Sequence, residues 1–202
     1  MGHRRFAAAG LAIALSTLGA GTAATQDVVK VGIVVPMTGS LGAAGREISD
    51  ACKVYMAQHG NEVAGKKIEL IIRDDGSVAD NAKRIAQELV VNDHVNVLGA
   101  GVTPSAMAMA PIATEGKVAT VVMISGTSVV TERSPYYVRT SFTLGQQSGI
   151  IADWATENGS KKAASIVSDF APGAEAGKVF EQRFTKGGGQ VLESLKIPMA
   201  CT

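Results

Sequence analysis

The sequence predicts an α/β protein, with a doubly wound lobe around a mostly parallel sheet followed by an incomplete second α/β lobe. Short runs of β-branched and apolar residues alternate with longer stretches that carry one apolar face, which is typical of strand–helix–strand units. Loops rich in glycine or hydroxyl residues follow three of the apolar runs. The pattern restarts near residue 142, and two more strands fit before residue 202. The crossovers between parallel strands should be right-handed.

The composition excludes several classes of partner. Hydrophobic residues make up 46% of the 202 residues, enough for one good core or two small ones. The formal net charge is +1 without a run of like charges, so nothing indicates binding to nucleic acid or to an acidic membrane surface. The cysteines, Cys52 and Cys201, and the single histidines lack metal-ligand spacing. We therefore expect a small-molecule ligand, with no metal and no cofactor.

Residues 1–24 have the pattern of a cleavable secretory signal peptide. A basic start that includes Arg4 and Arg5 precedes an apolar core at 6–18 and a small-residue stretch. As a helix this core would be about 20 Å long, too short for a hydrocarbon layer of about 30 Å. We expect cleavage near Ala23 or Ala24 and export of the mature chain to the periplasm.

The first strand is expected at Val28–Val35, a run that is almost entirely β-branched and apolar and fits a strand covered on both faces. Pro36 ends it. Gly39, Gly42 and Gly45 follow at three-residue spacing, which lets the backbone approach a ligand at a helix N-terminus. This spacing differs from the dinucleotide fingerprint. The loop therefore indicates either a site for an anionic or carboxylated ligand or an ordinary tight turn.

A helix should follow, with one apolar face on which Cys52 lies as a small core residue. The second strand is expected at Lys67–Arg73, and a turn at Asp74–Gly76. Ser77 and Asp80 have the spacing of a capping box for the next helix. The two helix faces consist of Ile48, Ala51, Cys52, Tyr55, Met56 and His59 in the first, and Ala82, Ile85, Ala86, Leu89 and Val90 in the second.

Two further strands complete the first lobe, at Val95–Leu98 and Lys117–Ile124, with a helix at about 104–115 between them. A polar loop follows each strand, at Gly99–Ser105 and at Ser125–Ser128. Ligands bind beyond the carboxyl ends of the strands in an open parallel sheet. We therefore expect these two loops and the first glycine-rich loop to converge on one binding site.

The second lobe begins after a boundary near residues 139–142, which gives a first lobe at 25–141 and a partial second lobe at 142–202. A sheet of two strands is marginal in water, so the apolar faces of its helices should have little sheet to pack on. The expected elements are a helix at Gln146–Glu157 that carries Ile150 and Trp154, a strand at Ala163–Val167, a helix with Ala176, Val179, Phe180 and Phe184 on one face, and a strand at Gln190–Ile197.

Several motifs occur in a fixed order along this pattern. They are Val34–Arg46, Gly65–Asp75, Ala86–Asp93, Ala110–Ala113, Ser134–Thr143 and Ser168–Gly173. In this order they resemble the type I periplasmic solute-binding proteins of ATP-driven (ABC) transporters, in the branch that binds branched-chain amino acids and amides. The resemblance implies a two-lobe, non-catalytic clamp of the periplasmic binding protein-like I fold. It also implies a monomer that takes an amino acid, amide or small carboxylate and delivers it to an ABC permease in the inner membrane.

The resemblance carries ligand-binding roles to four residues at the ends of the third and fourth strands. Thr103 would offer its hydroxyl to the ligand carboxylate. Ser125 would offer its backbone carbonyl to an ammonium group. Gly126 follows in the same loop, and Thr127 would bind the ligand through its N–H and hydroxyl. The chemistry fits a zwitterionic head group, which needs both donors and an acceptor. The alternative for Thr103 and Thr127 is a helix N-cap.

Two further positions of the site bear on the ligand. Ala44 stands near the position where the amino acid binders have an aromatic residue. Phe170 or Pro172 falls near the aromatic residue of the second lobe that closes over the ligand. The methyl group of Ala44 leaves a larger pocket, and Phe170 lacks a hydroxyl. Amides, urea or aromatic acids are therefore compatible with the site, as well as a leucine-like ligand.

Members of the resembled family continue for about as many residues again, and this chain departs from the family pattern after Pro198. We therefore interpret the chain as C-terminally truncated, with Cys201 in the divergent tail. This leaves a non-functional remnant or a sensory ligand-binding module as an alternative to a transport protein. An exported α/β enzyme is less favoured, because the sequence has no nucleophile elbow, phosphate-loop lysine motif or acid–base dyad at a strand end.

Overall fold

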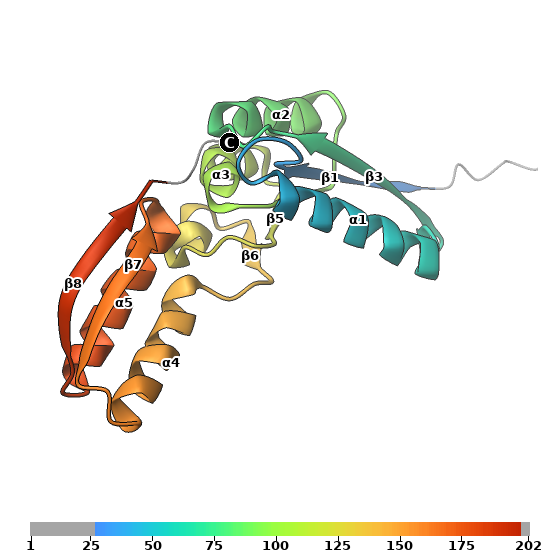
Figure 1. Ribbon diagram of the computed structural model, residues 1–202. Coiled ribbons are helices and arrows are strands. Elements are labelled where there is room, and N and C mark those ends of the chain that lie inside the picture. The colour runs from blue at the N-terminus through green and yellow to red at the C-terminus, as the bar shows by residue number, and fades with distance from the viewer. Residues whose placement is uncertain (1–26, 199–202) are drawn as a thin grey trace, which may run out of the picture.

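The computed structural model describes residues 27–198 as two lobes joined through residues 140–143 (Figure 1). The predicted signal peptide and Cys201 lie outside the described residues. The first lobe is a six-stranded sheet in the order β2-β3-β1-β4-β5-β6, and the second is a two-stranded sheet of β7 and β8. The predicted fold class, a doubly wound lobe followed by an incomplete α/β lobe, is confirmed.

All strands of the first sheet run parallel except β2, a two-residue strand that pairs antiparallel with β3 and was not predicted. Figure 1 shows α2 and α3 on one face of this sheet and α1 on the other. The elements of the first lobe are β1 (Val28–Val35), α1 (Gly42–His59), β2 (Glu62–Val63), β3 (Lys66–Asp74), α2 (Ala79–Val91), β4 (Val97–Ala100), α3 (Thr103–Gly116), β5 (Ala119–Val122), the 3-10 helix η1 (Ser128–Arg133) and β6 (Tyr137–Arg139).

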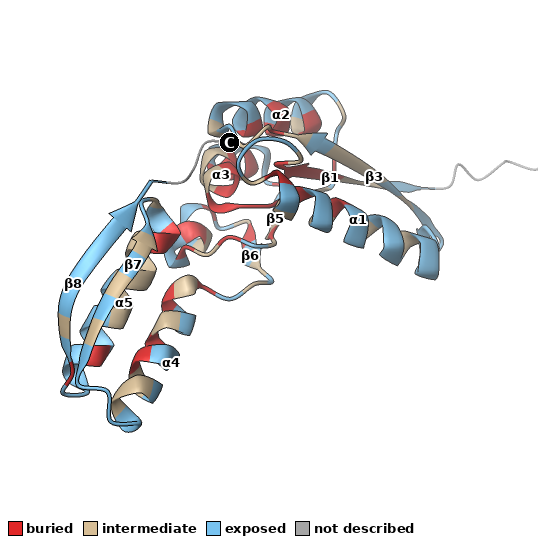
Figure 2. Ribbon diagram, viewed as in Figure 1, coloured by how far each residue is buried: buried red, intermediate tan, exposed pale blue. Residues whose placement is uncertain are grey.

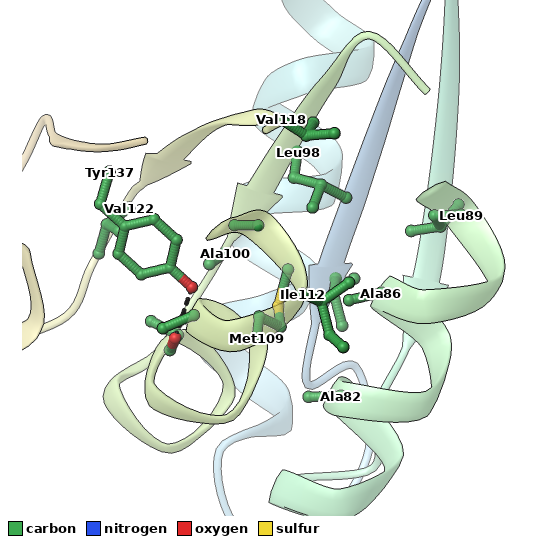
Figure 3. Close-up of a cluster of buried hydrophobic side chains, with 14 of the residues drawn as sticks. Ala82, Ala86, Leu89, Leu98, Ala100, Met109, Ile112, Val118, Val122 and Tyr137 are labelled. Atoms are coloured by element: carbon green, nitrogen blue, oxygen red, sulfur yellow. Dashed lines mark hydrogen bonds between the residues drawn. The ribbon is translucent and has the colours of Figure 1, made fainter. Parts of the chain in front are cut away.

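The core of the first lobe lies where α2 and α3 cover the sheet (Figure 3). Leu98 of β4 and Met109 of α3 are fully buried there. The predicted apolar face of α2 is confirmed at its four positions from Ala82 to Leu89. At the edge of this core, the Tyr137 hydroxyl donates a hydrogen bond to the Ala106 carbonyl at 2.6 Å, and burial raises the pKa of this phenol.

Helix α1 packs differently from the prediction. Tyr55 is 62% exposed, and Cys52 is only half-buried, which still raises the pKa of its thiol. Small residues, Gly42, Gly45 and Ser49, form the buried face instead. A Cβ on Gly45 would lie 1.8 Å from the Pro36 carbonyl oxygen, so a glycine is needed for the helix to start this close to the end of β1. The sequence pattern followed the large apolar residues and missed this contact.

The predicted capping box at Ser77 is wrong. Val78 is the N-cap of α2, and no side chain caps the helix. Ser77 has a φ of 64°, and its hydroxyl donates to the Thr38 carbonyl at 2.9 Å and accepts from the Leu41 N–H at 3.1 Å. The Ser77 hydroxyl therefore stabilises the loop after β1 and does not cap α2.

The second lobe contains α4 (Leu144–Glu157), β7 (Lys162–Ser168), α5 (Ala171–Lys186) and β8 (Gln190–Ile197). Helix α5 packs on both strands, whereas α4 packs mainly on α5, where Arg183 Nε donates to Asp153 Oδ1 at 3.0 Å. Ile150 and Trp154 of α4 are consequently exposed, as predicted from the small sheet. Phe184 is fully buried, contrary to that prediction, because its ring lies against Gly189 in the turn before β8.

Burial differs between the two lobes. Figure 2 shows buried residues gathered around α3 and the middle strands of the first sheet, while the outer surface of β7 and β8 is exposed. Among residues 27–198, no helix is both long and apolar enough to cross a membrane.

Candidate ligand-binding site

Three hydroxyl side chains meet at the carboxyl ends of β4 and β5. Thr103 Oγ1 lies 2.7 Å from Ser125 Oγ and 3.4 Å from Thr127 Oγ1, and all three residues are buried. Neither hydroxyl caps a helix: Val102 is the N-cap of α3, and Thr127, which is the N-cap residue of η1, makes no side-chain capping bond. The N-cap alternative is therefore contradicted, and the hydroxyls form a cluster that we call the hydroxyl triad.

A cavity of about 240 Å³ lies beside this triad, between the two lobes. Four predicted site residues line it: Ala44, Thr103, Gly126 and Phe170. The predicted Ser125 and Thr127 are not in the lining, and their hydroxyls contact that of Thr103. The remaining lining residues are Leu41, Val102, Ile124, Ser141, Phe142, Leu144 and Pro172.

The lobes touch directly beside the cavity. The Leu144 N–H at the start of α4 donates to the Gly126 carbonyl at 2.9 Å. The Ser128 N–H of η1 donates to Glu175 Oε2 of α5, also at 2.9 Å. The loop after β5 is thus held by both helices of the second lobe, so the cavity wall at Gly126 depends on the contact between the lobes.

Arg139 holds the same loop from the side of the sheet, a role that the sequence reasoning missed. Its guanidinium donates to the carbonyls of Ser125, Thr127 and Ser128, the last two at 2.5 and 3.1 Å. The Ser125 carbonyl that the family resemblance offered to an ammonium group therefore already has a cationic partner. All of these partners are backbone carbonyls, so no residue type in the sequence pointed to this role.

The electrostatics of the cavity favour a negative group. Helix α3 begins at Thr103, so the positive end of its dipole lies at the hydroxyl triad. The Arg139 guanidinium adds a positive charge behind the same loop. No described lining residue carries a carboxylate, and Glu175, outside the lining, accepts from the Ser128 N–H of this loop. Among the described residues, no cluster of three or more histidine, cysteine, aspartate or glutamate side chains could hold a metal ion.

Two neighbouring carboxylates fix the loops around the cavity. Asp74 accepts hydrogen bonds from the Met37 N–H at 2.7 Å and from the Thr38 hydroxyl at 2.7 Å. Burial alone would raise the pKa of Asp74, but the hydrogen bonds from Thr38, Gly76 and Met37 together lower it. Asp75 is fully buried and accepts from Ser105 Oγ at 2.5 Å. Burial raises the pKa of Asp75, and its hydrogen bonds only partly oppose this.

Asp75→Asn is expected to stabilise the protein increasingly as the pH rises. The folded-state pKa of Asp75 lies above the usual value of 3.8, so the folded state holds this proton more tightly than the unfolded chain. The contribution of Asp75 to the free energy of unfolding is therefore largest below about pH 4 and is lost as the pH rises through the folded pKa. Asparagine keeps the shape without titrating. Urea midpoints of both proteins from about pH 3 to 8 measure the difference, a range that also reaches below the usual carboxyl pKa.

Asp74→Asn is the matched control for this experiment. The folded-state pKa of Asp74 is lowered, so its contribution is present above its unfolded pKa and is lost as the pH falls through the folded value. The two variants should therefore differ from the parent protein with opposite dependence on pH. The same slope for both would contradict the assignment of the buried, protonatable carboxyl to Asp75.

Residues 28–202 match the profile of the protein family described as "Periplasmic binding protein". The chain belongs to this family. It is 44% identical over 192 residues to Leu/Ile/Val-binding protein homolog 6 of Brucella abortus, an alignment that covers 94% of this chain and 49% of the relative. The chain thus spans about half the length of the curated relatives it matches. The resemblance to type I solute-binding proteins is confirmed.

Solved structures similar to this chain are also solute-binding proteins of ABC transporters. A solute-binding protein of an ABC transporter from Rhodopseudomonas palustris BisB5, in complex with 3,4-dihydroxybenzoic acid, is 56% identical, with a TM-score of 0.84. Another from Rhodopseudomonas palustris, in complex with 4-hydroxybenzoate, is 40% identical with a TM-score of 0.81. The alignments cover 86% and 87% of this chain and 48% of each structure.

Proposed function

We propose that this chain is a non-catalytic substrate-binding component of an ABC uptake transporter, active in the periplasm, and that its ligand is a small aromatic carboxylate of the benzoate class. The observation that carries the proposal is the cavity between the lobes, which combines apolar walls with a buried hydroxyl triad. Two related solute-binding proteins from Rhodopseudomonas palustris hold hydroxylated benzoates. Delivery to an inner-membrane permease belongs to the same proposal.

The carboxylate of such a ligand would bind at the hydroxyl triad. Thr103, the member of the triad that lines the cavity, can turn its hydroxyl proton toward an anion, because a hydroxyl proton rotates to suit its acceptor. Ser125 Oγ can then donate to Thr103 Oγ1 from outside the lining. The positive end of α3 and the Arg139 guanidinium strengthen this preference. Hydrogen bonds to a charged group are stronger than those between neutral groups, so the triad would fix the orientation of the ligand.

The aromatic ring would lie against the apolar lining. Leu41 of the first lobe, Phe142 of the crossing and Phe170 of the second lobe supply flat or branched apolar surface. Ala44 contributes only a methyl group, which leaves room for a rigid ring. The volume of about 240 Å³ is below the roughly 300–1,000 Å³ of sites for drug-sized ligands, which suits a single ring.

A branched-chain amino acid is the second candidate ligand, favoured by the name of the Brucella relative, Leu/Ile/Val-binding protein homolog 6. Its ammonium group would need an acceptor. The Ser125 carbonyl accepts from Arg139, and no lining residue is acidic. A cation placed there would meet the guanidinium at short range, and the resulting repulsion counts against this ligand.

Thr103→Val is expected to weaken binding of 4-hydroxybenzoate by about 1–3 kcal/mol, because the carboxylate then loses a hydrogen-bond donor in a buried site. Calorimetry of the purified chain measures the loss. Thr185→Val, at an exposed position of α5, is the control and should leave the affinity unchanged. Tighter binding of leucine than of any benzoate, or equal affinity of the Thr103 variant and the parent, would contradict the proposal.

A further inference from the structure

Ser141 lies in the crossing between the lobes and lines the cavity. Its hydroxyl oxygen is buried and has no hydrogen-bond partner in the protein. Buried hydroxyls in folded proteins nearly always have a partner, since an unpaired one costs free energy. Among the described residues only Ser141 and Ser49 carry such an oxygen, and of these two Ser141 lines the cavity. The hydroxyl therefore lacks a partner at a place where a ligand can supply one.

The residues on either side of Ser141 are fixed by hydrogen bonds. The Thr140 N–H donates to the Val122 carbonyl at 3.1 Å, which ties the segment to β5. Thr143 and Gln146 form a reciprocal capping box at the start of α4, with distances of 2.9 and 3.2 Å. The backbone at Ser141 is thus held from both ends, while its side chain is free. Because no hydrogen bond holds the Ser141 hydroxyl in its present rotamer, it can turn into the cavity without breaking one.

The hydroxyl triad and Ser141 come from different parts of the fold. The triad belongs to the loops after β4 and β5, and no hydrogen bond joins it to Ser141. The lining of the cavity otherwise consists of apolar side chains and Gly126. A ligand with one polar group would satisfy the triad and leave Ser141 unpaired. A ligand with a second hydrogen-bonding group beyond its ring would satisfy both.

We propose that Ser141 is a specificity-determining residue that binds a second polar group of the ligand, so that the cavity selects hydroxylated aromatic carboxylates over benzoate itself. This inference rests on the proposed function, since it presumes that a carboxylate occupies the triad. The Ser141 hydroxyl can donate to or accept from a phenolic hydroxyl. Sites that pair a ligand hydroxyl discriminate strongly against the analogue without it, because the buried group of the protein then stays unpaired.

The test is calorimetry with three ligands, benzoate, 3-hydroxybenzoate and 4-hydroxybenzoate, on the purified chain and its Ser141→Ala variant. We expect the parent to bind at least one of the hydroxylated ligands more tightly than benzoate by about tenfold. Ser141→Ala should remove this preference, with a loss of about tenfold for that ligand and less than about twofold for benzoate, the size expected for one neutral hydrogen bond. The ratio of the affinities for the hydroxylated ligand and for benzoate is therefore the readout, because a serine with only a structural role would not change this ratio.

Ser49→Ala is the matched control, because the Ser49 hydroxyl of α1 is also buried and unpaired but lies outside the cavity lining. Both substitutions remove a buried unpaired oxygen, so both should leave the melting temperature of the ligand-free protein unchanged or raised. Only Ser141→Ala should change the selectivity. A lowered melting temperature for Ser141→Ala alone would overturn the inference, since it would show that the hydroxyl has a structural partner.

The remaining outcomes separate this inference from the proposed function. If the three benzoates bind the parent and Ser141→Ala weakens all of them equally, or none, the proposed function stands and the role of Ser141 is overturned. If no benzoate binds the folded parent chain, the proposed function fails, and the inference fails with it.

Discussion

Gly173→Ala is expected to destabilise the second lobe by more than about 3 kcal/mol, at or beyond the upper end of the usual cost of overpacking. Gly173 lies in the first turn of α5, where a Cβ would be 2.2 Å from the Ser168 carbonyl oxygen at the end of β7. A backbone atom cannot change rotamer to relieve the clash as a side chain can, so α5 would have to move away from β7. Urea unfolding followed by circular dichroism and by the fluorescence of Trp154 measures the loss.

Gly177→Ala, one turn further along α5, is the matched control. A Cβ at Gly177 would lie 3.3 Å from Val167 Cγ1, a side-chain atom that can shift slightly. Alanine also stabilises a helix interior over glycine by about 1 kcal/mol, so the net change should stay within about 1 kcal/mol. Equal destabilisation by both substitutions would show that the Gly173 contact does not limit the packing of α5.

Leu98→Ala should cost about 2–5 kcal/mol of the stability of the first lobe, the range for truncating a buried leucine. Leu98 of the central strand β4 is fully buried in the core of the first lobe (Figure 3). The hydrogen-bonded sheet cannot move to fill the space that the truncation leaves. Urea unfolding followed by circular dichroism measures the change. Because Leu98 lies in the first lobe and Trp154 in α4 of the second, the fluorescence transition of the second lobe should shift less than the circular dichroism transition.

Leu192→Ala provides the comparison on an exposed strand. Leu192 of β8 is 59% exposed, so its truncation should change stability by no more than about 0.5 kcal/mol. Similar losses from Leu98→Ala and Leu192→Ala would contradict the assignment of the core to the face of the sheet under α2 and α3.

The strands were predictable because burial in a parallel sheet requires runs of apolar residues. The first and last strands, Val28–Val35 and Gln190–Ile197, have the predicted bounds. The strand expected at Val95–Leu98 lies two residues later, because the Val95 N–H donates to the Leu89 carbonyl at the end of α2. The strand expected at Lys117–Ile124 is shorter, because Lys117 adopts the left-handed conformation that ends α3.

The candidate site was predictable only where sequence order implies proximity. Thr103 and Thr127 follow neighbouring parallel strands, so their closeness could be expected. Arg139 was missed because its partners are backbone carbonyls, which leave no mark on the sequence. Ser141 was missed because the pairing of a hydroxyl depends on the surrounding packing. The small contact face of α1 was missed for a related reason, since glycines carry no apolar signal.

The crossing at residues 140–143 has a consequence for motion. Ser141 and Phe142 of this segment line the cavity, while Thr140 and Thr143 tie it to β5 and α4. Any bending between the lobes must change backbone dihedral angles in or beside this segment, and a bound ligand touches the same residues. Occupancy of the cavity and the angle between the lobes are therefore linked equilibria: a ligand that prefers one angle raises its population, and whatever favours that angle raises the affinity by the same factor.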